Sequence, residues 1–176
     1  MKINFLLLTG VNKMNLIKSI LLTLALSLFI AGPTLAAEKA VGYFGWHAYG
    51  KYLQMGETMG FWRGEFSGSF DSDAGEGGLF HKASMRCPGS NTINFATGTT
   101  SAQGVCLIKD MDGDEAYLTW VVAGKLGQAN PGSFSYNGGT GKFEGLSGDG
   151  GTLIGHIVTN WADGDASGYA LWNRQK

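Results

Sequence analysis

The feature that most constrains the fold is a glycine-dense stretch over residues 137–151, with the sequence NGGTGKFEGLSGDGG. The rest of the chain is rich in aromatic and β-branched residues, and glycines in such a context mark points where backbones bend or approach closely. Phe143 and Leu146 lie within the stretch, which indicates that part of it faces a core. We interpret the stretch as turns and a bulge in a sheet, and not as a flexible tether.

The GGTGK segment inside this stretch has some similarity to a phosphate-binding loop. A Walker loop needs an additional glycine upstream and a Ser or Thr after the lysine, and here the glycine is missing and Phe143 follows Lys142. A dinucleotide fingerprint needs glycine where Glu144 stands. Both motifs also require a following helix, which the sequence does not predict. We therefore expect no nucleotide cofactor.

Residues 1–37 have the pattern of a secretory signal peptide. Lysines precede an apolar run over residues 20–31, and small residues follow it up to the expected cleavage site after Ala36 or Ala37. The run is shorter than the about 20 apolar residues of a membrane span. Met14 is an alternative start of the same signal. We expect a periplasmic or secreted protein without a membrane span, with residues 38–176 as its single domain.

The exported part of the chain is mildly acidic. It keeps all 14 acidic residues but loses Lys2, Lys13 and Lys18 from the 13 basic ones, so that its net charge is about −4. A nucleic-acid-binding protein or one bound to an anionic membrane surface would need a basic face. The composition therefore predicts neither kind of partner.

Almost no part of the exported chain has the periodicity of a helix. Short runs of aromatic and β-branched residues recur instead, separated by Gly, Asn and Asp, which is typical of an all-β barrel or sandwich. Asp112-Gly113 and Asp163-Gly164 each lie between two such runs, and we expect both to form type I′ hairpin turns. The predicted strands span residues 41–49, 58–70, 78–87, 92–96, 103–109, 115–123, 132–136, 142–146, 152–161 and 167–173.

Cys87 and Cys106 are the two cysteines of the chain, and both lie in the exported part. An even number of cysteines in an oxidising compartment favours a disulfide. The alternatives are two buried thiols or a redox pair, although a redox pair usually has Cys-x-x-Cys spacing. We expect a structural disulfide between Cys87 and Cys106.

Asp110, Asp112 and Asp114 form an acidic cluster that has some similarity to a calcium-binding loop. An EF-hand needs glycine at position six and glutamate at position twelve, whereas here position four is glycine and position twelve is Val121. A calcium site of another kind remains an alternative. The simpler interpretation is a hairpin tip whose three aspartates are exposed and metal-free.

The sequence predicts no catalytic group. The three histidines are scattered without zinc-site spacing, and no Gly-x-Ser-x-Gly motif presents a nucleophile. His156 alternates with Ile154 and Val158, which would place it on an inward face of the sheet as a hydrogen-bonded histidine. We expect His156 and Trp120 to border any pocket.

Four motifs together resemble a group of small exported bacterial proteins of unassigned function: Gly104-Val-Cys106, Asp110–Asp114, Trp120 and the segment from Gly138 to Gly148. The GGTGKF segment is also similar to the matching segment of allene oxide cyclases and dirigent proteins. That resemblance implies a closed, eight-stranded antiparallel barrel of the calycin-like kind, with a two-sheet sandwich as the alternative. It transfers no catalytic residue to this chain.

A small barrel of this kind is either filled by side chains or hollow enough for one small ligand. We therefore expect a non-catalytic protein that binds a small apolar ligand or a partner. The alternatives are a cyclase- or isomerase-like enzyme acting on a hydrophobic substrate in the same cavity, and a structural or interaction protein that binds no ligand.

Overall fold

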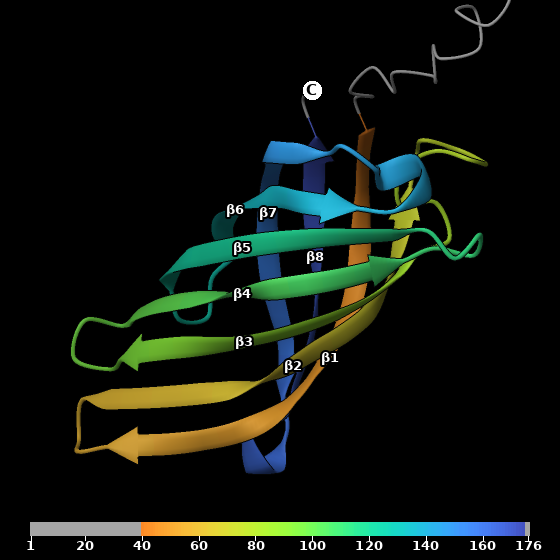
Figure 1. Ribbon diagram of the computed structural model, residues 1–176. Coiled ribbons are helices and arrows are strands. Elements are labelled where there is room, and N and C mark those ends of the chain that lie inside the picture. The colour runs from red at the N-terminus through yellow and green to blue at the C-terminus, as the bar shows by residue number, and fades with distance from the viewer. Residues whose placement is uncertain (1–39, 175–176) are drawn as a thin grey trace, which may run out of the picture. The chain divides into compact units, whose positions relative to one another are not determined.

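The computed structural model describes residues 40–174, which form a closed barrel of eight antiparallel strands (Figure 1). Each strand pairs with the next one along the chain, and β8 pairs with β1 to close the barrel. This confirms the predicted all-β closed barrel and excludes the sandwich, whereas the predicted signal peptide lies outside the described residues. The strands are β1 (Ala40–Met55), β2 (Met59–Ser72), β3 (Ser84–Asn94), β4 (Thr99–Lys109), β5 (Glu115–Lys125), β6 (Asn130–Gly139), β7 (Ser147–Asn160) and β8 (Ala166–Arg174), with 3-10 helices η1 (Gly141–Phe143) and η2 (Ala162–Gly164).

The two ends of the barrel differ in their connections. At one end, which we call the closed end, lie the start of β1, the end of β8 and the loops 73–83, 110–114 and 140–146 (Figure 1). At the other, the open end, lie the three short turns that join β1 to β2, β3 to β4 and β5 to β6, together with η2. Within residues 40–174, no helix is long and apolar enough to cross a membrane.

Large side chains and glycines share the inner face of the barrel. The ring of Trp120 on β5 lies beside Gly104 of β4, where an added Cβ would be 2.8 Å from Cζ2 of the indole. In the same way, the indole of Trp46 on β1 occupies the space that a side chain at Gly168 of β8 would need. Because these rings lie against the glycine backbone of a neighbouring strand, they line the wall of the barrel instead of filling its centre.

The closed end is filled by an aromatic cluster around Phe80. Loop 73–83 inserts this residue with 1% of its surface exposed, at centroid distances of 5.1 Å from Phe70, 5.4 Å from Trp172 and 5.7 Å from Phe143. The backbone of Phe80 has a φ of 61°, a conformation that bulky residues rarely adopt. Burial of the ring among three others offsets that strain, and the cluster plugs this end of the barrel.

Three predicted strands differ from the observed ones. Residues 78–83 are a loop and β3 begins only at Ser84, because Phe80 and Lys82 both have positive φ. The run 92–96 is no separate strand: residues 92–94 are the end of β3, which continues through Pro88 and Gly89, and residues 95 and 96 belong to the following turn. Residues 142–146 form η1 and a turn, since Phe143 is buried as an anchor at the closed end and not as part of a ladder.

The predicted turns are confirmed in part. Asp163 and Gly164 have φ values of 64° and 92°, as a type I′ turn requires. At Asp112-Gly113 only the glycine has positive φ, so the prediction of a type I′ turn is wrong there. The predicted bulge lies between β6 and β7, where Gly150 is the extra residue opposite Phe134 and Ser135.

Candidate functional site: a hollow barrel

The interior of the barrel contains a cavity of about 810 Å³. This volume lies within the range of pockets that bind small molecules. Aromatic side chains from β1, β2 and β5 form much of its wall, and they pack edge to face around Phe66, with centroid distances of 5.2 Å to Trp46 and 5.5 Å to Trp120. The deeper wall is also apolar and includes Ile108 and Leu118 beside the aromatic cluster of the closed end. The cavity is therefore predominantly apolar.

The cavity extends to the open end, where it is bordered by exposed apolar side chains. Phe95 and Leu126 belong to the turns after β3 and β5, Val158 to the last residues of β7, and Trp161 to the segment between β7 and β8. Their exposed fractions range from 41% for Leu126 to 66% for Val158. Apolar groups gathered at one exposed site are typical of a surface that contacts a ligand or partner.

The wall near the open end carries a small number of polar groups. Thr100 donates a hydrogen bond of 2.6 Å to Oδ1 of Asn91 on the neighbouring strand. Asn130, at the start of β6, accepts a 2.9 Å hydrogen bond from the backbone N–H of Lys125. The sequence does not single out these residues, because all three fall in the gaps between the predicted strands. The signal that could have identified Asn91 is its position two residues from Ile93, on the same face of a strand.

Trp120 and His156, the residues expected at a pocket, both border the cavity but in different ways. Trp120 lies on the inner wall, and its Nε1 has no hydrogen-bond partner among the described residues. His156 pairs with Tyr169 and stacks on it at 4.7 Å, with 10° between the ring planes. Its ring shares the outer face with the exposed Ile154, since Leu153 and Gly155 hold the inward positions of β7. The expected inward orientation of His156 is therefore wrong.

A serine–histidine pair lies on the outer face, near the open end. Ser167 accepts a 2.9 Å hydrogen bond from Nε1 of Trp161, and its Oγ is also 2.9 Å from Nδ1 of His47. Neither Ser167 nor His47 lines the cavity. This arrangement fastens the β7–β8 connection to β1. Trp62 fastens the same connection to β2 by donating to the carbonyl oxygen of Gly164 at 2.6 Å.

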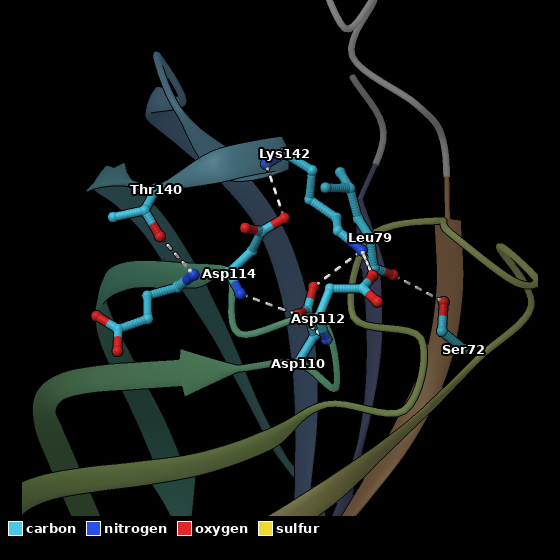
Figure 2. Close-up of polar contacts among 8 residues, drawn as sticks. Ser72, Leu79, Asp110, Asp112, Asp114, Thr140 and Lys142 are labelled. Atoms are coloured by element: carbon cyan, nitrogen blue, oxygen red, sulfur yellow. Dashed lines mark hydrogen bonds and ion pairs between the residues drawn. The ribbon is translucent and has the colours of Figure 1, made fainter.

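The acidic hairpin tip is part of the closed end. Asp110 is only 8% exposed, and its Oδ1 accepts hydrogen bonds from the backbone N–H groups of Asp112 (2.9 Å) and Asp114 (3.1 Å) (Figure 2). Its Oδ2 is 2.9 Å from Nζ of Lys142, which is also 2.8 Å from Oδ2 of Asp112. The expectation that all three aspartates are exposed is thus wrong, since Asp110 is buried and Asp114 is half-buried.

The glycine-dense stretch holds the hairpin in place. The backbone N–H of Lys142 donates to Oδ2 of Asp114 at 3.1 Å, and Thr140 accepts from the backbone N–H of Glu115 at 2.9 Å (Figure 2). Gly141 has a φ of 52°, and a side chain there would collide with the carboxylate of Asp114. The lack of a Cβ at this position is what allows the two segments to meet.

A lysine supplies the counter-charge of the acidic hairpin tip. Partial burial lowers the pKa of Lys142, but its hydrogen bonds to Asp112 and Asp110 outweigh that effect and raise the pKa above its ordinary value. The hydrogen bond from Lys142, followed by its charge, lowers the pKa of Asp112. Among residues 40–174 no group of three or more His, Cys, Asp or Glu side chains is arranged to hold a metal ion. Lys142 supplies the positive charge that the aspartates require.

Tyr136 and Arg174 are buried at the same end. The guanidinium carbon of Arg174 lies 5.2 Å from the centre of the Tyr136 ring, a cation–π contact. Burial raises the pKa of Tyr136 to about 12, although the charge of Arg174 opposes the shift. Within the described part of the chain, the Tyr136 hydroxyl and Nε and Nη1 of Arg174 have no hydrogen-bond partner.

Cys87 and Cys106 form the predicted disulfide, which joins β3 to β4 with the two Cα atoms 4.1 Å apart. Both cysteines line the cavity on the side of Trp120. A disulfide of this kind fits a protein of an oxidising compartment.

These features do not identify the protein by similarity. No family model matches the chain, and a search of curated proteins finds no significant relative.

Proposed function

We propose that the protein is a non-catalytic binder of a small apolar molecule, which it holds inside the barrel. The observation that carries this proposal is the cavity of about 810 Å³, because eight-stranded barrels are narrow enough for side chains to fill them completely. Here rings such as that of Trp120 pack closely on inward glycines such as Gly104, and a cavity remains between the walls. The apolar rim at the open end gives a hydrophobic ligand a surface of entry.

The lining residues support binding more than catalysis. The deep half of the cavity is bounded by apolar side chains such as Ile108, Leu118 and Leu153. The titratable groups at the cavity are Tyr52, His156 and Asp165, and they lie near its mouth. The Tyr52 hydroxyl donates to Gln54, His156 is stacked on the outer face, and Asp165 accepts a hydrogen bond from the backbone N–H of Gly50. A base or acid acting on a buried substrate would have to lie within reach of the reacting atom.

We further propose that the protein acts after export, as the signal-peptide pattern of residues 1–37 predicts and as the disulfide supports. A relation to the allene oxide cyclase and dirigent-like barrels stays a prediction. The closed eight-stranded barrel agrees with such a relation, but a shared fold does not transfer an activity.

The proposal is tested by calorimetric titration of the protein with 2-ethylnaphthalene, an uncharged apolar probe. We expect one molecule to bind per chain. Ala102→Phe places a ring in the cavity from its wall and should abolish binding, because Ala102 is one of the lining residues. Ser101→Phe is the matched control, since Ser101 is the exposed neighbour on the same strand. Absence of binding to the wild type, or equal binding by Ala102→Phe, would refute the proposal.

A further inference from the structure

Three polar side chains form what we call the polar arc, which consists of Asn91, Thr100 and Asn130. They lie on the cavity wall close to its mouth, on β3, β4 and β6. Thr100 pairs with Gly124 of β5, and Oδ1 of Asn130 occupies the space beside that glycine. The arc therefore crosses four neighbouring strands at nearly one level, above an apolar lumen.

The arc presents hydrogen-bond donors to the cavity. Oδ1 of Asn91 is occupied by the Thr100 hydroxyl and Oδ1 of Asn130 by the backbone N–H of Lys125. The backbone N–H of Lys125 can only donate, so it fixes the orientation of the Asn130 amide, because only the oxygen of an amide accepts. At Asn91 the Thr100 hydroxyl donates to the amide oxygen in the same sense. Within residues 40–174, Nδ2 of neither asparagine donates a hydrogen bond to another residue. The complement of such a site is a ligand group that accepts hydrogen bonds.

The charge of the surroundings restricts that group further. Among the described residues that line the cavity there is no lysine or arginine, and Asp165 contributes a carboxylate near the mouth. A carboxylate on the ligand would lose hydration without meeting a cation, at a considerable cost in free energy. A carbonyl or ether oxygen accepts the same hydrogen bonds without that cost.

We infer that the lumen selects an uncharged amphipathic molecule, which places a carbonyl-type acceptor at the polar arc and its apolar body in the lumen below. This inference rests on the proposed function, since it names the class of ligand that the same cavity takes. It predicts that an acceptor adds affinity to an apolar probe of unchanged shape.

The test compares 2-acetylnaphthalene, 2-ethylnaphthalene and 2-naphthoate by calorimetric titration. For the wild type we expect the ketone to bind about 3- to 10-fold more tightly than the ethyl compound, as one or two neutral hydrogen bonds allow. The naphthoate should bind more weakly than the ketone. In the double variant Asn91→Asp with Asn130→Asp, the acceptor oxygens for Thr100 and Lys125 remain but the amide donors are lost. The preference for the ketone over 2-ethylnaphthalene should then disappear, because the donors that distinguish the two probes are gone.

Asn137→Asp is the matched control, because Asn137 is an exposed asparagine at the far end of β6. It should keep the wild-type preference. Equal affinity of the wild type for the ketone and the ethyl compound, or a preference that persists in the double variant, would overturn the inference and leave the proposed function intact. If neither compound binds the wild type, the inference and the proposed function both fail.

Discussion

Replacing Lys142 with methionine tests whether the closed end depends on a lysine held between two aspartates. Lys142→Met keeps most of the length of the side chain but removes the ammonium group. The carboxylate of Asp110, whose side chain is 2% exposed, would then have no cation beside it, whereas that of Asp112 is 69% exposed and remains hydrated. The cost of the substitution should therefore come from Asp110.

The magnitude follows from the contacts that Asp110 keeps. Removing one partner of a buried ion pair typically costs about 3–5 kcal/mol. Oδ1 of Asp110 retains its two backbone N–H donors, and the Lys142 side chain is itself 16% exposed. We therefore expect a loss of about 2–3 kcal/mol in the free energy of unfolding, below the full value for an isolated pair.

The measurement is urea denaturation followed by tryptophan fluorescence, with an unchanged m value as the sign of unchanged compactness. Asp112→Asn is the control, and it should have little effect because that carboxylate is exposed. Combining Lys142→Met with Asp110→Asn removes the uncompensated charge and should recover much of the loss. A Lys142→Met variant as stable as Asp112→Asn would refute the reasoning.

Three further predictions concern the disulfide, the buried tyrosine and the inward glycines. Cys87→Ser and Cys106→Ser should each lower the free energy of unfolding by about 3 kcal/mol in urea denaturation, because either substitution opens the same loop of sequence separation 19. Clearly unequal losses would contradict this. Folding raises the pKa of Tyr136 from 10.0 to about 12. The contribution of this residue to the free energy of unfolding is therefore present below pH 10 and is lost as the pH rises from 10 to 12. Over this pH range the wild type should lose about 2 kcal/mol more free energy of unfolding than Tyr136→Phe, measured by urea denaturation at each pH. If the stability of both proteins falls with pH in parallel, Tyr136 is not the cause of the loss. Gly50→Ala places a Cβ against the backbone oxygen of Arg63 and 2.5 Å from Cε2 of Trp62, and it should lower the free energy of unfolding by about 1–3 kcal/mol. Gly45→Ala on the same strand meets nothing within 4 Å and should be nearly neutral in thermal denaturation. The reverse order would argue against close packing at Gly50.

The strands were predictable where aromatic and β-branched residues alternate between the two faces, as in β5, because that pattern has only one good structural solution. The pattern of apolar residues wrongly predicts that Phe80 and Phe143 lie in strands. Both are apolar residues beside glycines, and the sequence does not distinguish a residue in a strand from one that a loop inserts into the end of a barrel. The deciding factor is packing between segments that are distant in the sequence.

The site was less predictable than the fold. The burial of Asp110 depends on Lys142, which a different loop supplies, so the acidic cluster alone suggested an exposed tip. The inward direction of Asn91 and Asn130 depends on the register of β3 and β6, and a shift by one residue would turn them outward. The sequence predicts the wrong face of β7 for His156 because Leu153 and Ile154 are equally apolar. Only the register shows that Leu153 is the buried one of the two.

The central claim, that the barrel is hollow and accepts one apolar molecule, is tested most directly by diffraction from crystals soaked in 2-bromonaphthalene. The bromine atom has an anomalous signal that locates it without assumptions about the rest of the density. We expect one bromine site inside the barrel, near Phe66, Trp120 and Val122 of the cavity wall. Bromine sites confined to the outer surface, with side chains filling the interior, would contradict the account.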